Sequence, residues 1–296
     1  MTSSRNEIGA DDLYVMCNNP NPMVDRWACR DCGFVAWGPG RPALAERIQS
    51  HVVGHHREAI ERDDFRLAWE CPYCDRAEHT HDEAAGRRGF AEHLYSHVES
   101  LVEEGTHVAE AIGGSGDVLV VSPLESTGAD NARIHFVSAC DVAIVVTTNP
   151  AARLRLLAER LEELPAWTVV LTTEESSLAD IEEPDLSSLP VEVVALDGSL
   201  GLSGLGETLS RVVGEHESAD ARLTVEFDIL SELLSEFSLQ QVFKFLHVLS
   251  ARLADADALA HYYLDPDAES ESTMNMLREL FDLAIEPSET VFTTVT

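Results

Sequence analysis

Lysine is almost absent from this chain of 296 residues, because Lys244 is the only lysine among 20 basic side chains. Acidic side chains number 53, and the formal net charge is −33. The acids are spread along segments with apolar patterning, which excludes a disordered acidic tail as the source of the charge. Such a composition is typical of halophilic proteins, in which carboxylates keep the surface hydrated. Molar salt screens their repulsion, since it shortens the Debye length to about 3 Å.

Further absences exclude whole classes of protein. No run of about 18 apolar residues occurs, so no membrane span is expected. The opening MTSSRNEIGADD lacks the basic-then-apolar pattern of a signal peptide, which favours a cytoplasmic location. No Gly-rich loop ends in Lys-Ser or Lys-Thr, so ordinary ATP hydrolysis is not expected. Because His-Glu-x-x-His and Gly-x-Ser-x-Gly are missing too, we assign no catalytic residue and expect a protein that is not an enzyme.

Four of the six cysteines form two Cys-x2-Cys pairs, which in a cytosolic chain indicate metal binding before disulfides. A shift of 42 residues lays one pair on the other, and Trp27 then falls on Trp69. Both copies read Cys-x2-Cys-x18-His-x3-His. Identical four-ligand spacing predicts two metal sites. The expected ligands are Cys29, Cys32, His51 and His55 in the first site, and Cys71, Cys74, His93 and His97 in the second.

The spacing suits two closed, tetrahedral Zn²⁺ sites per chain. A Cys-x2-Cys turn brings two thiolates to one point, and histidines four residues apart project from one face of a helix. Four protein ligands leave no position for water, so the zinc is expected to be structural, and its binding to supply much of the folding energy. His56 remains an alternative to His55 as a ligand. Cys17 and Cys140 are expected to be free thiols.

A DNA-reading role for these zinc fingers is possible but less favoured. The DNA-binding Cys2His2 finger has about 12 residues between its ligand pairs, whereas both copies here have 18. Arg87 and Arg88 stand near an expected helix start, where a base contact could form. The segment 25–105 is nevertheless net acidic, which favours solvated surface arginines.

The sequence divides into five parts. We expect a flexible lead-in over 1–24, a tandem zinc module over 25–105 with copies at 27–60 and 69–102, and a linker over 106–116. A second domain then spans 117–288, and a tail spans 289–296.

The second domain alternates apolar strands with amphipathic helices, which predicts a doubly wound, mostly parallel α/β sheet. The expected strands are 117–123, 141–148, 167–175, 191–197, 223–228 and 258–265. The expected helices are 152–164, 205–216, 239–254 and 274–286.

Within this domain, "FKFLHVLSARL", "HYYLDPDA" and "LRELFDLAIE" resemble the C-terminal half of a haloarchaeal family of KaiC-like proteins in the RecA superfamily. The upstream "VLVVSP" and "LGETLSRVV" fit the same resemblance, which covers about 117–286. It implies a RecA-like sheet in a degenerate group that lacks the phosphate-binding loop and has regulatory roles. The zinc module lies outside it.

Taken together, these patterns favour a non-enzymatic regulatory or adaptor protein that acts through a protein partner not identified by the sequence. The first alternative is a transcription regulator that uses the fingers. The second is a residual nucleotide-binding protein that uses the loop at 198–206 and Asp228, placed like a Walker-B aspartate. Self-association is left open.

Overall fold

The computed structural model describes residues 23–62, 66–173, 190–197, 201–217 and 221–295. Its described residues fall into two units. Residues Ala109–Glu289 belong to the first, which we call the sheet unit. Residues Met23–Val108 and Thr290–Thr296 belong to the second, which we call the Cys/His unit.

Continuous apolar runs form the strands of the sheet unit, as the sequence predicts. Adjacent strands follow the order β10-β9-β8-β11-β12-β7-β13, and every neighbouring pair is parallel. Every residue of β8, β11 and β12 is buried, because helices cover a parallel sheet on both faces. The strands are β7 (Gly116–Val121), β8 (Val142–Val146), β9 (Trp167–Thr172), β10 (Val191–Ala195), β11 (Leu223–Phe227), β12 (Leu259–Leu264) and β13 (Leu283–Pro287).

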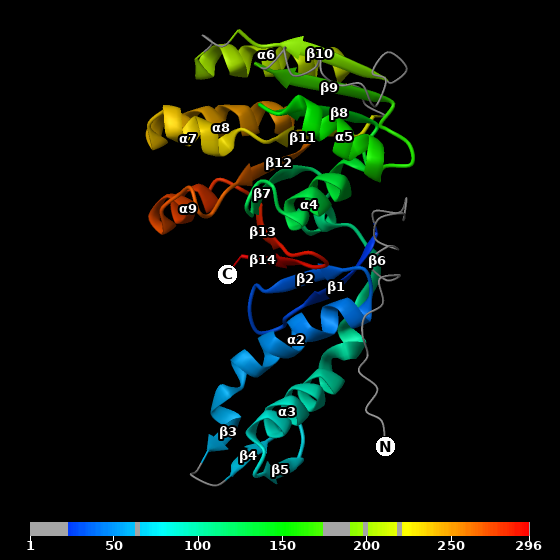
Figure 1. Cartoon of the computed structure of the whole chain (residues 1–296), viewed down its shortest axis with the longest axis vertical. Coiled ribbons are helices and arrows are strands. Elements are labelled where there is room, and N and C mark those ends of the chain that lie inside the picture. The colour runs from blue at the N-terminus through cyan, green and yellow to red at the C-terminus, as the bar shows by residue number, and fades with distance from the viewer. Residues whose placement is uncertain (1–22, 63–65, 174–189, 198–200, 218–220, 296) are drawn as a thin grey trace. The chain divides into compact units, whose positions relative to one another are not determined.

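Helices lie on both faces of this sheet, with α4 and α5 on one face and α7 and α8 on the other (Figure 1). The expected fold class, a doubly wound and mostly parallel α/β sheet, is therefore confirmed. Side-chain caps mark several helix starts: Ser126 accepts from the amide of Ala129, and Asn149 from that of Ala152. The helices are α4 (Thr127–Val137), α5 (Pro150–Arg160), α6 (Leu202–His216), α7 (Leu230–Glu236), α8 (Leu239–Asp255) and α9 (Glu271–Arg278).

The helix expected over 274–286 is wrong in its second half. Helix α9 ends at Arg278, and the residues that follow form strand β13 against β7. The main chain is anchored where the strand begins, because Asp282 accepts a hydrogen bond from the amide of Asp117 at 2.9 Å. Pairing with a distant strand thus overrides a local helical pattern. Helices α4 and α7 were not expected.

The Cys/His unit contains the same arrangement twice, an antiparallel strand pair followed by a helix. In the first copy β1 (Val24–Ala28) pairs with β2 (Val35–Gly38) ahead of α2 (Arg41–His55). In the second copy β4 (Leu67–Glu70) pairs with β5 (Ala77–Thr80) ahead of α3 (Glu83–Val98). The remaining elements of this unit are η1 (Arg57–Ala59), β3 (Ile60–Arg62), η2 (Glu99–Leu101) and β6 (Glu103–Thr106). Only the first residue of η3 (Val108–Ile112) belongs to this unit, and the others belong to the sheet unit.

One hydrophobic core joins the two copies. Trp27, Ile48 and Val52 of the first copy and Trp69 and Leu94 of the second belong to a single buried cluster. The two fingers are therefore not independently folded, because neither copy has a complete hydrophobic core of its own. Gly86 stands where the repeat places Leu44, because other side chains already fill that space in the second copy.

Two of the expected boundaries need correction. The tail expected over 289–296 contains strand β14 (Phe292–Thr294), which pairs antiparallel with β2. Val291 and Phe292 are buried, so burial and strand pairing hold this segment in the Cys/His unit. The linker expected over 106–116 contains the helical turn η3. The lead-in expected over 1–24 lies outside the described residues except at its end, where β1 begins at Val24.

Among the described residues, no helix combines the length and apolar character that crossing a membrane requires.

Candidate metal centres

The cysteines of each copy lie in the turn between its two strands, and the two turns have the same backbone geometry. The amide of Cys29 donates to the carbonyl of Phe34 at 2.9 Å, and the amide of Cys71 donates to that of Arg76 at 2.8 Å. Each turn also directs an amide at a sulfur, from Phe34 to Cys32 Sγ and from Tyr73 to Cys71 Sγ, both at 3.4 Å. These turns bring two sulfurs to one side of each strand pair.

The helix after each strand pair supplies the histidines. In α2, Leu44, Ile48 and Val52 are buried, and the same helix carries His51 and His55 one turn apart. In α3, His93 and His97 have the same separation, and His97 lies at the penultimate position of the helix. Burial of the apolar face thus fixes where both imidazoles point.

The structure gathers all eight expected ligands into two clusters, and within each cluster the four ligand atoms lie within 4.8 Å of one another. In the second cluster, Cys74 Sγ lies 3.3 Å and Cys71 Sγ lies 3.5 Å from a histidine Nε2. The Nε2 atoms of His93 and His97 are 3.3 Å apart. In the first cluster, Cys32 Sγ lies 3.5 Å from His51 Nε2.

These separations fit a tetrahedral cation. Zn–S bonds of about 2.3 Å and Zn–N bonds of about 2.0–2.1 Å place sulfur and nitrogen roughly 3.5 Å apart and two nitrogens roughly 3.3 Å apart. A cation bound between the two imidazole nitrogens would accept the lone pair of each, as tetrahedral coordination requires. Both clusters can therefore hold a metal ion.

The electrostatics of the ligands agree with this role. The pKa of His51 is lowered mainly by burial and further by the neighbouring His55. The pKa of His93 is lowered in the same way, mainly by burial and further by His97. Both imidazoles are thus kept in the neutral form that binds metal. Burial raises the pKa of the Cys29 and Cys71 thiols, so a bound cation is needed to convert them to thiolates.

Aromatic rings pack against one imidazole of each cluster, while two of the four ligands in each cluster remain exposed. The ring of Phe34 stacks on His51 with centroids 4.0 Å apart, and Trp27 meets the same imidazole edge-on at 5.9 Å. In the second copy, Trp69 stacks on His93 at 5.5 Å. Aromatic contacts of this kind lower the local dielectric beside His51 and His93, which strengthens the bond between a cation and these two imidazoles.

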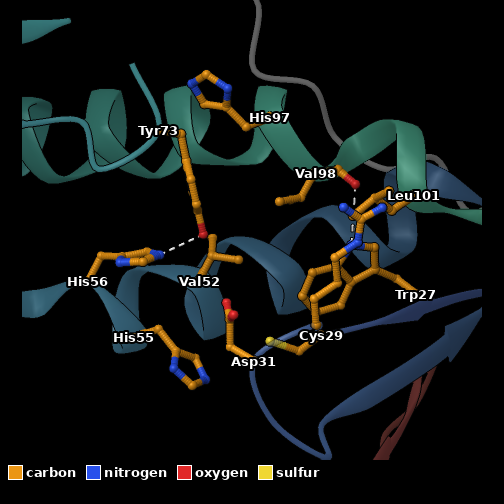
Figure 2. Close-up of a pocket in the computed structure, with 11 residues that line it drawn as sticks. Trp27, Cys29, Asp31, Val52, His55, His56, Tyr73, His97, Val98 and Leu101 are labelled. Carbon is orange, nitrogen blue, oxygen red and sulfur yellow. Dashed lines mark hydrogen bonds between the residues drawn. The ribbon is translucent and has the colours of Figure 1, made fainter. Parts of the chain in front are cut away.

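His56, the alternative to His55, is not part of the first cluster. Its Nε2 lies 2.7 Å from the hydroxyl oxygen of Tyr73 in the second copy, as Figure 2 shows. Among the other expected features, Cys140 is a free thiol, and Cys17 lies outside the described residues. Residues 198–200 of the Gly-rich stretch lie outside them too.

The arginines that suggested DNA contact lie on α3. Arg87 Nε donates to Glu83 Oε1 at 3.1 Å, an exposed pair one helical turn apart. Arg88 is exposed. Both arginines sit on a surface that carries carboxylates of the same helix.

A second group of charged residues, of which only Asp228 was expected from the sequence, lies at the carboxyl ends of strands in the sheet unit. Arg133 of α4 is fully buried and donates to Asp228 at 2.5 Å and to Asp130 at 2.9 Å. Its Nε lies 3.4 Å from Glu226, and its guanidinium lies 4.3 Å from the ring centroid of Tyr263. A second guanidinium, that of Arg153, lies 3.3 Å from Asp228.

The protonation behaviour of this buried group follows from its geometry. Burial disfavours the charged guanidinium, but Asp228 and Glu226 more than offset this and raise the pKa of Arg133 above its usual range. Burial raises the pKa of Glu226 to about 7, against the attraction of Arg133. The carboxylate of Asp228 is thus committed to internal partners. The sequence singled out only Asp228. Its arginine partners were not identified, because no local sequence pattern links residues that lie on different elements.

Comparison with known proteins gives a family and weak structural neighbours. A family model described as a family of unknown function, DUF7504, matches residues 115–287. No curated protein sequence matches the chain. An uncharacterized protein of Pyrococcus horikoshii, PH0321, solved in complex with an unknown peptide, is 11% identical, with a TM-score of 0.42 over 60% of this chain and 81% of its own. Flagellar accessory protein FlaH of Methanocaldococcus jannaschii is 12% identical, with a TM-score of 0.33 over 60% of this chain and 75% of its own.

The family match spans more than half of the chain and coincides with the sheet unit, whereas both metal clusters lie before it. The chain therefore belongs to the DUF7504 family.

Proposed function

We propose that the protein is a non-enzymatic regulatory or adaptor protein. In this proposal, two Zn²⁺ ions fold the Cys/His unit, which presents a surface to a protein partner. The sheet unit is a RecA-like domain that no longer hydrolyses ATP.

Zinc is the metal that the donor set favours. Two thiolates and two imidazoles at tetrahedral spacing suit Zn²⁺, whereas Mg²⁺ and Ca²⁺ require oxygen ligands. Each cluster already has four protein ligands, so a bound ion keeps no open position for a substrate. A closed site of this kind stabilises a fold and does not catalyse a reaction.

The main support for the proposed loss of ATP hydrolysis is the pairing of Asp228 with Arg133 and Arg153. In open α/β sheets, nucleotides bind beyond the carboxyl ends of the strands, at the N-terminus of the helix after the first strand. Here a carboxylate at that edge is neutralised by internal guanidinium groups, so it is not available to a metal–nucleotide complex.

The start of α4, where a phosphate would sit, is also covered. A Cβ placed on Gly128 would lie 2.7 Å from the carbonyl oxygen of Pro287 and 3.1 Å from that of Ser288. Two carbonyl oxygens against the first turn of the helix oppose the binding of an anion. This supports a domain that has lost nucleotide hydrolysis.

The resemblance noted in the sequence supports a haloarchaeal, KaiC-like group of regulatory proteins as the origin of the sheet unit. We extend this to a halophilic and cytoplasmic protein that acts through a protein partner, with self-association as a further possibility. A DNA-binding role has less support, because Arg87 is already paired with Glu83 and the segment that carries both clusters is net acidic.

The test combines metal content with nucleotide titration on the purified full chain in molar KCl. Native mass spectrometry is expected to find two zinc ions per chain. Calorimetric titration with ATP and Mg²⁺ is expected to give no binding heat, and a phosphate-release assay no turnover. Fewer than two tightly held zinc ions would overturn the metal assignment, and ATP hydrolysis abolished by Asp228→Asn would overturn the non-enzymatic role.

A further inference from the structure

A cavity of about 290 Å³ lies inside the Cys/His unit, between the two copies of the repeat. Trp27, Asp31 and Val52 of the first copy and Tyr73 and Val98 of the second copy line it, together with the expected metal ligands Cys29, His55 and His97. Figure 2 shows side chains of both copies around the same space, with the Tyr73 hydroxyl directed toward His56. The volume is close to the lower limit of small-ligand pockets, about 300 Å³, and suits one large side chain.

The floor of the cavity is apolar. Val52 is buried, and Val98 and Leu101 are partly buried in the core that both copies share. The indole of Trp27 contributes ring carbons, because its Nε1 already donates to the carbonyl of Val98 at 3.3 Å. An occupant that removes this surface from water is therefore apolar where it contacts the floor.

The rim is polar and carries one charge of each sign. Arg30 and Asp31 both line the cavity and are exposed. A guanidinium donates hydrogen bonds and a carboxylate accepts them, so together they match the carbonyl and amide of a peptide main chain. Tyr73 is 44% exposed, and its ring offers an aromatic contact beside them. Such a rim, in a net acidic unit, does not favour the phosphates of a nucleic acid.

The cavity borders both metal clusters, because Cys29 and His55 of the first cluster and His97 of the second are among the residues that line it. The repeat matches all ligands between the copies, yet it sets Asp31 against Tyr73 and His56 against Val98. The copies thus agree at the ligands that border the cavity and differ at these other lining positions. This difference makes the space between two similar fingers asymmetric, with a charged rim on the side of the first copy.

We propose that this cavity binds one large apolar side chain of a partner polypeptide, while the partner main chain contacts Arg30 and Asp31. The proposal rests on the adaptor function and names its docking point. An apolar anchor in a pocket with a polar rim is the usual form of an interface hot spot.

The experiment selects a display library of random linear peptides against the zinc-loaded full chain in molar KCl. Enriched peptides are labelled, and their affinity is measured by fluorescence anisotropy. Val98→Phe fills the cavity, and Val53→Phe makes the same change at a partly buried valine of α2 that does not line it. Arg30→Gln removes the positive charge of the rim, with exposed Arg47→Gln as its control.

We expect enriched peptides to share one large apolar residue, and its replacement by alanine to weaken binding about tenfold or more. Val98→Phe should weaken binding to a similar extent and Arg30→Gln about threefold, whereas Val53→Phe and Arg47→Gln should leave it unchanged. Metal content checks that each variant is folded. If Val98→Phe loses zinc, the alanine-substituted peptide and Arg30→Gln carry the test.

Three results would overturn the proposal that this cavity binds a partner polypeptide. They are no enrichment of an apolar anchor, equal binding to a folded Val98→Phe variant, and displacement of the peptide by duplex DNA. Peptides that bind equally to that variant would leave the adaptor function in place and move its docking point elsewhere. Failure of the adaptor function itself would instead appear as missing zinc or as ATP turnover.

Discussion

The Nε2 atom of His56 lies 2.7 Å from the hydroxyl oxygen of Tyr73, and their rings meet edge to face at 5.0 Å. His56 follows a ligand of the first cluster, and Tyr73 lies between the cysteines of the second. The ring of Tyr73 also lies 5.4 Å from that of His97, a ligand of the second cluster. One contact therefore connects the surroundings of both metal clusters.

The first prediction is that the two clusters load metal cooperatively, since they share one core as well as this contact. Cys74→Ser, which removes a ligand of the second cluster, should weaken Zn²⁺ binding at the first by about tenfold or more, because metal binding is coupled to folding of the whole core. Chelator competition measures the affinity, and Co²⁺ absorption reports the coordination. Tyr73→Phe keeps all ligands and should have a smaller effect. An unchanged affinity at the first cluster in Cys74→Ser would show that the fingers are independent.

The second prediction concerns Gly86 in α3. A Cβ there would lie 2.7 Å from Thr80 Cγ2 and 2.8 Å from Leu67 Cδ2. Gly86→Ala should therefore destabilise the Cys/His unit by about 1–3 kcal/mol through overpacking. The same change at Gly89, where nothing lies within 4 Å, should stabilise the helix by about 0.5–1 kcal/mol. Urea unfolding of zinc-loaded protein, followed by circular dichroism, checks both, and equal effects would contradict the packing argument.

The third prediction concerns the buried guanidinium of the sheet unit. Arg133→Met should destabilise the unit by about 3–5 kcal/mol, because it leaves Asp228 and Glu226 buried without their main cationic partner. Arg211→Gln removes an exposed pair with Glu215 on α6 and should cost only about 0.3–0.5 kcal/mol. Denaturant midpoints of the two variants separate these cases. Similar midpoints would mean that the buried group contributes little to the fold.

The fourth prediction is a pH dependence that resides in His261. This residue is fully buried in β12, and burial lowers the pKa of its imidazole to about 3. The unfolded imidazole takes up a proton below its ordinary pKa of 6.5, while the folded one stays neutral until about pH 3. The folded state therefore loses stability as the pH falls through 6.5. Between pH 7 and pH 5 this group should cost about 2 kcal/mol.

The comparison of wild type with His261→Phe isolates that effect, since other groups titrate equally in both proteins. The difference in the free energy of unfolding between them should shift by the same amount in favour of the variant from pH 7 to pH 5. His247→Phe, at an exposed position of α8, is the control. A difference that stays constant with pH would mean that His261 is protonated in the folded protein.

The sequence was sufficient for features that depend on local spacing. The 42-residue repeat identified every residue that the structure gathers into the two clusters, because a turn and a helix determine where those side chains lie. Apolar runs identified the strands β7 to β12 for a similar reason. Missed or misassigned features depend on partners far along the chain. The sequence of strand β13 has a helical pattern, and its pairing with β7 makes it a strand. Arg133 meets Asp228 only because α4 packs beside β11.

Strand β14 joins the Cys/His unit through residues that the ribosome makes after the entire sheet unit. The Thr294 hydroxyl accepts a hydrogen bond from the amide of Val35 and donates one to the carbonyl of Gly33. These bonds add a third strand to the pair that carries Cys29 and Cys32. The fingers are therefore synthesised many seconds before their last strand, since synthesis proceeds at about 5–20 residues per second. A fragment cut after residue 108 carries all eight ligands but lacks this strand, so studies of metal uptake require a chain that extends beyond Thr294.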